Sequence, residues 1–291
     1  MYNMVFKIYG YFLMVVNVPY VLKDYFAPET GREYGVGFIK KLVVTVRMAA
    51  NNLTIISGSN FFEHLAMATK ILRVPKSTEG CLVECGSYKG VSTSNLSLVA
   101  RLCNRRLNVF DSFQGLPEPS ERDKAHIIAQ MGKVDTYAKG AWAGSLEEVK
   151  GNVTRHGAIE VCDFNVGFFE DSMPHFEKDC AFAFIDVDLR DSLETCVRYL
   201  WPLLMDGCCI FTHEAHHKEI AALFFDTEWW RENLSAEPPG LIGASTELGM
   251  VPGGHFLRGI GYAVKNPQVL DLREDPQVGA SRDKAGRRAA C

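Results

Sequence analysis

Short apolar runs alternate with amphipathic stretches between residues 81 and 265. The runs have the length of strands, and the stretches between them space their apolar residues as helices do, which predicts a βαβ architecture around a parallel sheet. The predicted strands are residues 81–85, 107–111, 158–164, 181–188, 207–212 and 259–265. The predicted helices are residues 90–103, 145–157, 192–204 and 215–230, and Ser145 with Glu148 forms a capping box at the start of the second.

The two ends of the chain depart from this alternation. Residues 8–22 are apolar and uncharged, but they are shorter than the roughly 20 residues that a membrane-spanning helix needs. We expect residues 1–60 to form an N-terminal helical arm or lid that packs on the core or on a second subunit, with shallow membrane contact as the less favoured alternative. Residues 61–266 are predicted to form one α/β domain. Residues 267–291 are polar and aperiodic, which predicts a disordered tail.

Composition narrows the class of protein. The chain has 291 residues and a net charge of -4, so it lacks the basic excess of a nucleic-acid-binding protein. It contains nine cysteines, several of them inside apolar runs. This usage is typical of reduced, buried thiols, and it predicts a cytoplasmic protein without a disulfide framework.

Polar and glycine-rich residues follow the predicted strands, at the edge of a parallel sheet where ligands bind. The first strand runs into "ECGSYKG", in which Gly86 would let a ligand approach the backbone and Gly90 would open the next helix. Asp111 ends the second strand and suits the diol of a ribose. These features predict an adenosine-containing cofactor, but they do not distinguish NAD from other cofactors that contain adenosine.

The later strands favour group transfer over hydride transfer. Asp186 and Asp188 follow the fourth strand, and His213 and Glu214 follow the fifth. Carboxylates suit magnesium, and an added imidazole makes manganese a second candidate. A bound cation lowers the pKa of a hydroxyl, which a hydride-transfer enzyme does not need. We therefore expect Asp186, His213 and Glu214 to hold a divalent cation.

The residues from His213 to His217 also spell H-E-x-x-H, the motif of zinc metallopeptidases. In those enzymes both histidines lie on one helix. Residues 207–212 have the composition of a strand, so His213 is expected in the turn before a helix. The peptidase remains an alternative hypothesis.

Several segments resemble the macrocin O-methyltransferase (TylF-type) family of class I S-adenosylmethionine-dependent methyltransferases. They are "LVECGSYKGVST", "VFDSFQGLPEP", "SLEEVKGNVTRHG", "VGFFEDSMP" and "FIDVDLRDSLETCVRYLWPLLMDG", and together they span roughly residues 60–265. The resemblance implies a Rossmann-like α/β fold with a central, mostly parallel seven-stranded sheet flanked by helices. It also implies a divalent-metal-dependent enzyme, expected to be a dimer, that methylates a sugar hydroxyl of a glycosylated natural product or a polysaccharide.

The resemblance also assigns roles to residues. Glu84, Gly86 and Gly90 would line the methionine end of S-adenosylmethionine, Asp111 would take the ribose, and four further residues would lie near the adenine: Ser112, Phe113, Gly167 and Phe168. Ser87, Tyr88, Ser92 and Asp186 complete the predicted cofactor site. The predicted catalytic residues are Asp188 as the base, Asp186 and His213. The family usually has two aspartates where this chain has His213-Glu214, which alters the expected metal site.

The sequence thus predicts an S-adenosylmethionine-dependent O-methyltransferase acting on a small-molecule or glycoside acceptor. An NAD-linked oxidoreductase and the zinc peptidase are the alternatives, together with a binding protein that has lost catalysis.

Overall fold

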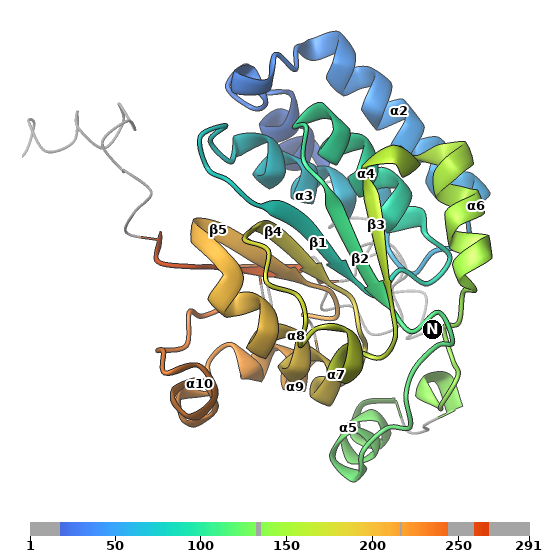
Figure 1. Ribbon diagram of the computed structural model, residues 1–291, viewed down its shortest axis with the longest axis vertical. Coiled ribbons are helices and arrows are strands. Elements are labelled where there is room, and N and C mark those ends of the chain that lie inside the picture. The colour runs from blue at the N-terminus through green and yellow to red at the C-terminus, as the bar shows by residue number, and fades with distance from the viewer. Residues whose placement is uncertain (1–17, 132–134, 216, 244–258, 268–291) are drawn as a thin grey trace, which may run out of the picture.

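The computed structural model describes residues 18–131, 135–215, 217–243 and 259–267 (Figure 1). Its described residues form one six-stranded sheet in the order β3-β2-β1-β4-β5-β6. Strands β1 to β5 are parallel, and β6 runs antiparallel to β5. The strands are β1 (Cys81–Cys85), β2 (Leu107–Asp111), β3 (Cys162–Val166), β4 (Cys180–Ile185), β5 (Leu204–Thr212) and β6 (Gly261–Val264).

Helices cover both faces of this sheet (Figure 1). The α-helices are α2 (Phe38–Thr54), α3 (Phe61–Arg73), α4 (Val91–Leu102), α5 (Glu121–Met131), α6 (Leu146–His156), α7 (Phe169–Ser172), α8 (Arg190–Leu203), α9 (Lys218–Leu223) and α10 (Thr227–Leu234). Short 3-10 helices are η1 (Arg32–Tyr34), η2 (Asp135–Tyr137) and η3 (Ile159–Val161), and residues 18–26 are also helical.

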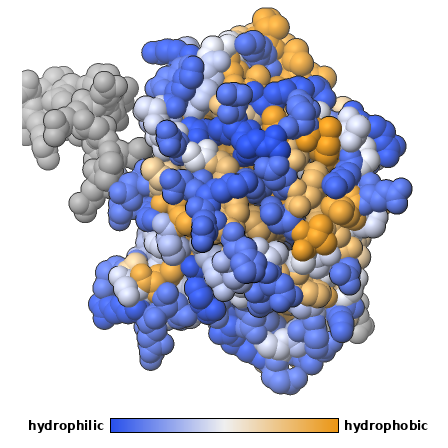
Figure 2. Space-filling model, viewed as in Figure 1, coloured by the Kyte–Doolittle hydropathy of each residue, from blue (hydrophilic) through white to orange (hydrophobic). Residues whose placement is uncertain are grey.

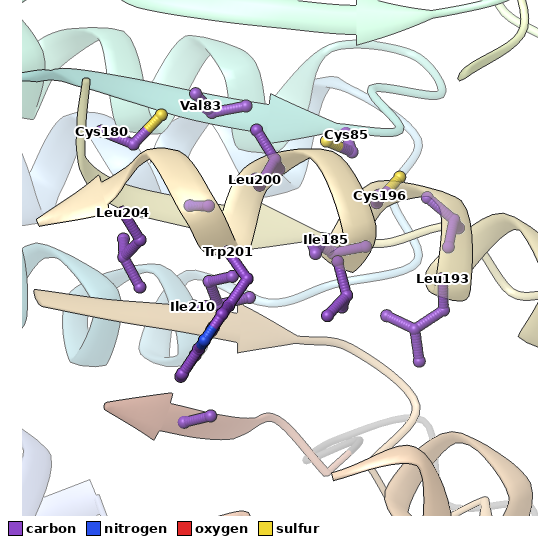
Figure 3. Packing of buried hydrophobic residues seen from close by; sticks show 14 of the residues in the cluster. Val83, Cys85, Cys180, Ile185, Leu193, Cys196, Leu200, Trp201, Leu204 and Ile210 are labelled. Carbon is purple, nitrogen blue, oxygen red and sulfur yellow. The ribbon is translucent and has the colours of Figure 1, made fainter. Parts of the chain in front are cut away.

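Two apolar clusters hold the layers together, one on each face. Alternate residues of β1 enter different clusters, because successive side chains of a strand point to opposite faces: Leu82 packs with α2, α3, α4 and α6, and Val83 packs with α8, α9 and α10. Figure 3 shows Leu200 and Trp201 of α8 packed over the sheet in the second cluster. The predicted Rossmann-like α/β fold is confirmed.

The structure differs from the sequence predictions in three places. The predicted seventh strand is not found in the described residues, where Ile242 makes only an isolated antiparallel bridge with Tyr262 of β6. Strand β3 begins at Cys162 because η3 occupies the start of the predicted run. The predicted helix 215–230 is two helices, since Asp226 caps α10 by accepting a hydrogen bond from the Trp229 N–H.

The N-terminal helices pack against the domain. A capping box between Asn60 and Glu63 starts α3, and α2 and α3 both lie against α4. The outer side of α2 exposes apolar side chains, which gather at the top of the view in Figure 2: Phe38, Ile39, Leu42, Val43 and Val46. Among the described residues, no helix is long and apolar enough to cross a membrane. Most of the apolar stretch 8–22 and almost all of the predicted tail, residues 267–291, lie outside the described residues.

Candidate active site

A cavity with about 840 Å³ of empty space lies at the carboxyl edge of the sheet, and we call it the edge cavity. Its walls are the turns after β1, β2, β4 and β5, the residues that follow β3, and loops around Ser57 and Trp142. It lies where β1 and β4 are neighbours and the strand order reverses, the usual ligand site of an open α/β sheet. Most predicted site residues line it: Gly86, Ser87, Tyr88, Ser92, Asp111, Ser112, Phe168, Asp186, Asp188, His213 and Glu214.

Four predicted cofactor residues do not line the edge cavity. Glu84 is fully buried within β1, one residue before the strand ends. Gly90 caps the start of α4, Phe113 is 8% exposed, and Gly167 follows β3. These four residues shape the turns around the cavity.

The turns around the cavity contain residues in the left-handed backbone region, which is strained for any residue with a side chain. Tyr88 after β1, Phe113 after β2, Asp188 after β4 and Glu214 after β5 have φ values of 45°, 56°, 60° and 58°. Such strain persists only where the surrounding structure enforces it, and it clusters at functional sites. Of these residue types only aspartate is common in the left-handed region, so the strain at Tyr88, Phe113 and Glu214 could not be predicted from the sequence.

Gly86 has a structural role that the sequence did not predict. Its φ is +86°, and a Cβ added there would lie 1.9 Å from the carbonyl oxygen of Asp186. The close approach that requires glycine is therefore to the end of β4. Two hydrogen bonds fix this contact between turns, from Gly86 N–H to Phe110 O and from Asp186 N–H to Cys85 O.

Asp111 joins the turns after β1 and β2. Its Oδ2 accepts hydrogen bonds from the Ser87 N–H at 2.6 Å and the Ser87 hydroxyl at 3.0 Å, and its Oδ1 accepts one from the Phe113 N–H at 2.6 Å. Burial raises the pKa of Asp111, although these donors act against the shift. A carboxylate has about four acceptor sites, and these donors occupy three of them. Asp111 therefore mainly holds the turns, and at most one site remains for a ligand hydroxyl.

Two of the buried polar atoms around the cavity that lack a hydrogen bond of good geometry within the described residues belong to Glu84. Burial raises the pKa of this group to about 8, and the nearby hydroxyls of Ser92 and Thr93 act against that shift. The indole N–H of Trp142, a cavity-lining residue, also lacks a partner among the described residues. Unpaired buried polar groups are costly, so these atoms are suited to meet polar groups of a ligand.

The N-terminal segment contributes to the cavity in a way that the sequence analysis missed. Residues 57–59, after α2, form part of its wall. Ser59 is held by a buried network, in which its hydroxyl lies 2.9 Å from Nε2 of His64 and the Asn95 amide lies 2.7 Å from Nδ1. Burial, and then the charge of His213, lowers the pKa of His64 to about 3, so His64 is neutral. No local motif relates α2 to strand ends so distant in the sequence.

His213 lies at the centre of a cluster of carboxylates. Its Nδ1 is 3.2 Å from Asp186 Oδ1 and 3.2 Å from Glu214 Oε1, and its Nε2 is 3.8 Å from Oε2 of Glu63. Burial disfavours the charged imidazole, but these carboxylates outweigh it and hold the pKa of His213 well above its usual value. Glu63, from α3, is a member of the cluster that sequence reasoning missed.

The predicted cation site is not supported by this arrangement. Asp186, His213 and Glu214 do meet, with a carboxylate oxygen of each acid 3.2 Å from Nδ1 of the His213 imidazole. No group of three or more His, Cys, Asp or Glu side chains within the described residues is arranged to hold a metal ion.

The H-E-x-x-H motif does not lie on one helix. His213 follows β5, Glu214 has left-handed backbone, and His217 is the N-cap of α9. His217 Nε2 lies 3.3 Å from Oε2 of Glu214. This is not the geometry of a zinc peptidase, which needs both histidines on one helical face.

Comparisons with known proteins agree with this geometry. Residues 83–215 match the family Methyltransf_24, described as "Methyltransferase domain". These residues are similar to methyltransferase domains. They include most of β1, all of β2 to β5 and every predicted site residue, so the predicted enzyme class, an S-adenosylmethionine-dependent methyltransferase of class I, is confirmed.

Two solved structures show the same fold. The O-methyltransferase NovP has a TM-score of 0.55 and 21% identity, over 70% of this chain and 79% of its own. CalS11, a calicheamicin methyltransferase, has a TM-score of 0.50 and 17% identity, over 77% of this chain and 92% of its own. No curated protein matches the chain by sequence. The narrower resemblance to the macrocin family remains a prediction.

Proposed function

We propose that this protein is an S-adenosylmethionine-dependent O-methyltransferase, and that its acceptor is a sugar hydroxyl. The observation that carries the proposal is the edge cavity of a methyltransferase domain, with Asp188 in its wall. NovP, which shares the fold, is an O-methyltransferase by name, and this supports a hydroxyl acceptor. The choice of a sugar rests on the macrocin-type segments of the sequence.

The residues of the cavity fit the cofactor. Glu84 is a buried acid suited to the amino group of the methionine end, and Asp111 can accept at most one further hydrogen bond, from a ribose hydroxyl. Ser112 and Phe168, which line the cavity, would lie beside the adenine, and Phe113 and Gly167 would shape the turns that carry them. The cofactor supplies an electrophilic methyl group on its sulfonium.

Asp188 is the proposed base. As the acceptor oxygen forms its bond to the methyl carbon and the bond from sulfur to that carbon breaks, the hydroxyl proton would pass to the Asp188 carboxylate. His213 is unsuited to this role, because its raised pKa keeps it protonated. We assign Asp186 and His213 to positioning: the imidazolium neutralises part of the carboxylate charge beside the reacting groups.

A divalent cation is not included in this proposal, because its predicted ligands are paired with one another. Removing metals with EDTA should therefore leave methyl transfer intact. Loss of transfer after chelation, with recovery on adding magnesium or manganese, would restore the metal-dependent mechanism that the sequence suggested.

Two measurements test the function itself. Calorimetry should detect S-adenosylhomocysteine binding at micromolar concentrations or below, whereas NADH should not bind. Label from methyl-labelled S-adenosylmethionine should appear in a hydroxylated glycoside acceptor as an alkali-stable ether. Tight NADH binding without S-adenosylhomocysteine binding would favour the oxidoreductase. The predicted dimer and cytoplasmic location remain predictions.

A further inference from the structure

A second hollow, which we call the side recess, opens beside the edge cavity with about 360 Å³ of empty space. Asp188 lines both hollows, so the side recess begins at the proposed base. Its other walls include Asp123 and His126 of α5, Arg190 of α8 and Glu219 of α9. A molecule held there would reach the edge cavity beside Asp188.

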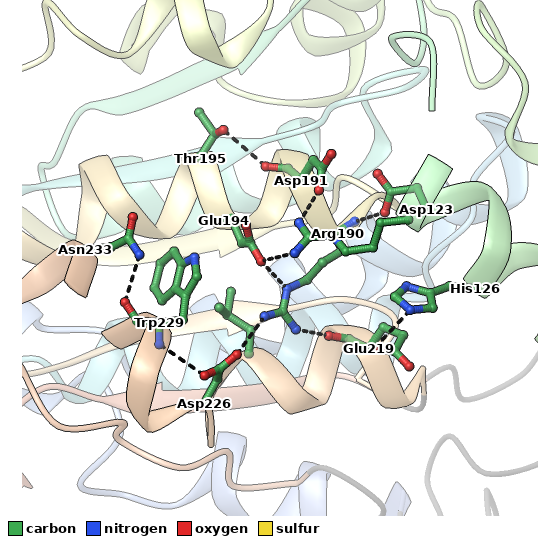
Figure 4. A network of polar contacts seen from close by, with 12 residues as sticks. Asp123, His126, Arg190, Asp191, Glu194, Thr195, Glu219, Asp226, Trp229 and Asn233 are labelled. Atoms are coloured by element: carbon green, nitrogen blue, oxygen red, sulfur yellow. Dashed lines mark hydrogen bonds and ion pairs between the residues drawn. The ribbon is translucent and has the colours of Figure 1, made fainter. Parts of the chain in front are cut away.

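The one arginine among the described lining residues is already neutralised. Arg190 donates from Nε to Glu194 Oε1 at 2.7 Å, and it also bonds the backbone carbonyl of Glu219. Its third nitrogen lies 3.6 Å from Oδ2 of Asp226. Figure 4 shows this guanidinium extending from α8 between the carboxyl groups. Its charge is balanced inside the protein and does not attract an anion in the recess.

The remaining charged groups of the recess are acidic. The described lining contains three carboxylates, of Asp123, Asp188 and Glu219, and it contains no lysine. His126 faces one of them, with Nε2 3.4 Å from Oε2 of Glu219 (Figure 4). Carboxylates in a partly enclosed site repel phosphate and attract hydroxyl and ammonium donors.

We propose that the side recess binds the acceptor, and that this acceptor is a hydroxylated molecule with a basic amine, such as an amino sugar, and not a nucleotide diphosphate sugar. The inference rests on the proposed function, because it takes the neighbouring edge cavity as the cofactor site. Glu219 is the residue assigned to the amine, since its side chain is 22% exposed and lies on the recess wall. Its Oε1 is 3.5 Å from Nζ of Lys218, but that lysine is 85% exposed, and a ligand amine can displace so exposed a partner. Asp123 is less available, because its Oδ1 accepts the backbone N–H of Arg190.

The test uses the full chain saturated with S-adenosylhomocysteine and three ligands in calorimetry: a methyl glycoside of an amino hexose, the matching neutral methyl hexoside, and a nucleotide diphosphate hexose. The amino glycoside should bind most tightly and the nucleotide sugar least. Glu219→Gln should weaken the amino glycoside on the order of tenfold and leave S-adenosylhomocysteine unchanged, because it removes one charged partner. Glu228→Gln, the same change on the exposed side of α10, should alter neither affinity.

Stronger binding of the nucleotide sugar would overturn the proposal, and so would no binding of the amino glycoside or binding that Glu219→Gln leaves unchanged. The proposed function and the assignment of the side recess can each fail without the other. If S-adenosylhomocysteine does not bind, the proposed function fails. If it binds and the amino glycoside does not, only the assignment of the recess fails.

Discussion

The edge cavity and the side recess meet at Asp188, but their walls come from different parts of the fold. The edge cavity is enclosed by turns at the ends of strands, with left-handed residues such as Tyr88 and Glu214 held in place by the sheet. The side recess is enclosed mainly by α5, the start of α8 and α9. Arg122 of α5 pairs with Asp191 and Glu194 of α8, and His126 of α5 pairs with Glu219 of α9. One hollow is fixed by backbone contacts between strand ends, and the other by side-chain charges between helices.

This difference assigns separate properties to the two hollows. Strand-end turns hold a cofactor in one position, which methyl transfer needs because its main requirement is alignment. Helix surfaces can change side chains without disturbing the sheet, so acceptor specificity can vary there. The following substitutions should affect one hollow and spare the other, and they are ordered from the largest expected effect.

Gly86→Ala should damage the edge cavity most. The new Cβ would lie 1.9 Å from a backbone oxygen at the end of β4, and neither strand can move without breaking ladder hydrogen bonds. We expect a loss of stability above the roughly 4–5 kcal/mol that marks an exceptional substitution, measured by urea unfolding or seen as a failure to fold.

Gly35→Ala is the matched control for that substitution. Gly35 also has a positive φ, of +64°, but it lies on the surface, and a Cβ added there would have no atom within 4 Å. The backbone strain alone costs about 1–2 kcal/mol. Equal losses for the two variants would show that strain, and not the contact with Asp186, makes glycine necessary at position 86.

Arg190→Met should destabilise the side recess, as Gly86→Ala destabilises the edge cavity. It removes a buried guanidinium and leaves Glu194 with Arg122 as its remaining charged partner, at 3.0 Å. Breaking a buried ion pair in this way costs about 3–5 kcal/mol of stability. S-adenosylhomocysteine affinity of the folded fraction should stay unchanged, while acceptor binding falls.

Arg231→Met is the control for charge removal, because the pair between Arg231 and Glu237 is exposed. It should change the free energy of unfolding by at most about 1 kcal/mol. If Arg190→Met also abolished S-adenosylhomocysteine binding, the two hollows would not be independent.

Asp188→Asn should leave both hollows in place and remove the base that they share. The expected result is a fall in kcat of about 10²–10⁴-fold, with S-adenosylhomocysteine affinity retained. The measurement is methyl transfer to the acceptor that the wild type uses, beside Asp171→Asn on the exposed α7 as control. Activity close to wild type would move the role of base to another residue.

The two hollows also differ in how far the sequence could predict them. Gly86, Asp111 and Asp186 were predictable because the ends of apolar strands can be recognised, and parallel strands bring their carboxyl ends to one edge. Glu219 was not, because no local pattern shows that α9 lies beside α5 and the turn after β4. Helix α5 has no strong apolar stripe and was not predicted at all.

The sequence predicted which residues come together at the site better than it predicted their chemistry. His213 was expected beside Asp186 and Glu214, and it lies there. Glu63 could not be expected, because it comes from α3 and meets His213 only through the packing of the N-terminal helices on the sheet. Glu63 adds a third acidic group beside the imidazole, so the residues expected to hold a cation belong to a larger ion-pair cluster.

Glu84→Gln should have the smallest effect and the sharpest dependence on pH. Burial raises the pKa of Glu84 from its ordinary 4.5 to about 8, so between these values the unfolded chain releases a proton that the folded chain keeps. This group therefore lowers stability progressively as pH rises from about 4.5 to 8, and Glu84→Gln should remove that part of the pH dependence.

If the amino group of the cofactor meets Glu84, binding ionises the carboxyl, and S-adenosylhomocysteine should release a proton at pH 7. Calorimetry in buffers of different ionisation enthalpy measures that proton, and Glu84→Gln should abolish it while weakening binding roughly tenfold, the value of one charged hydrogen bond. Proton release that persists in Glu84→Gln would place the amino group elsewhere in the edge cavity.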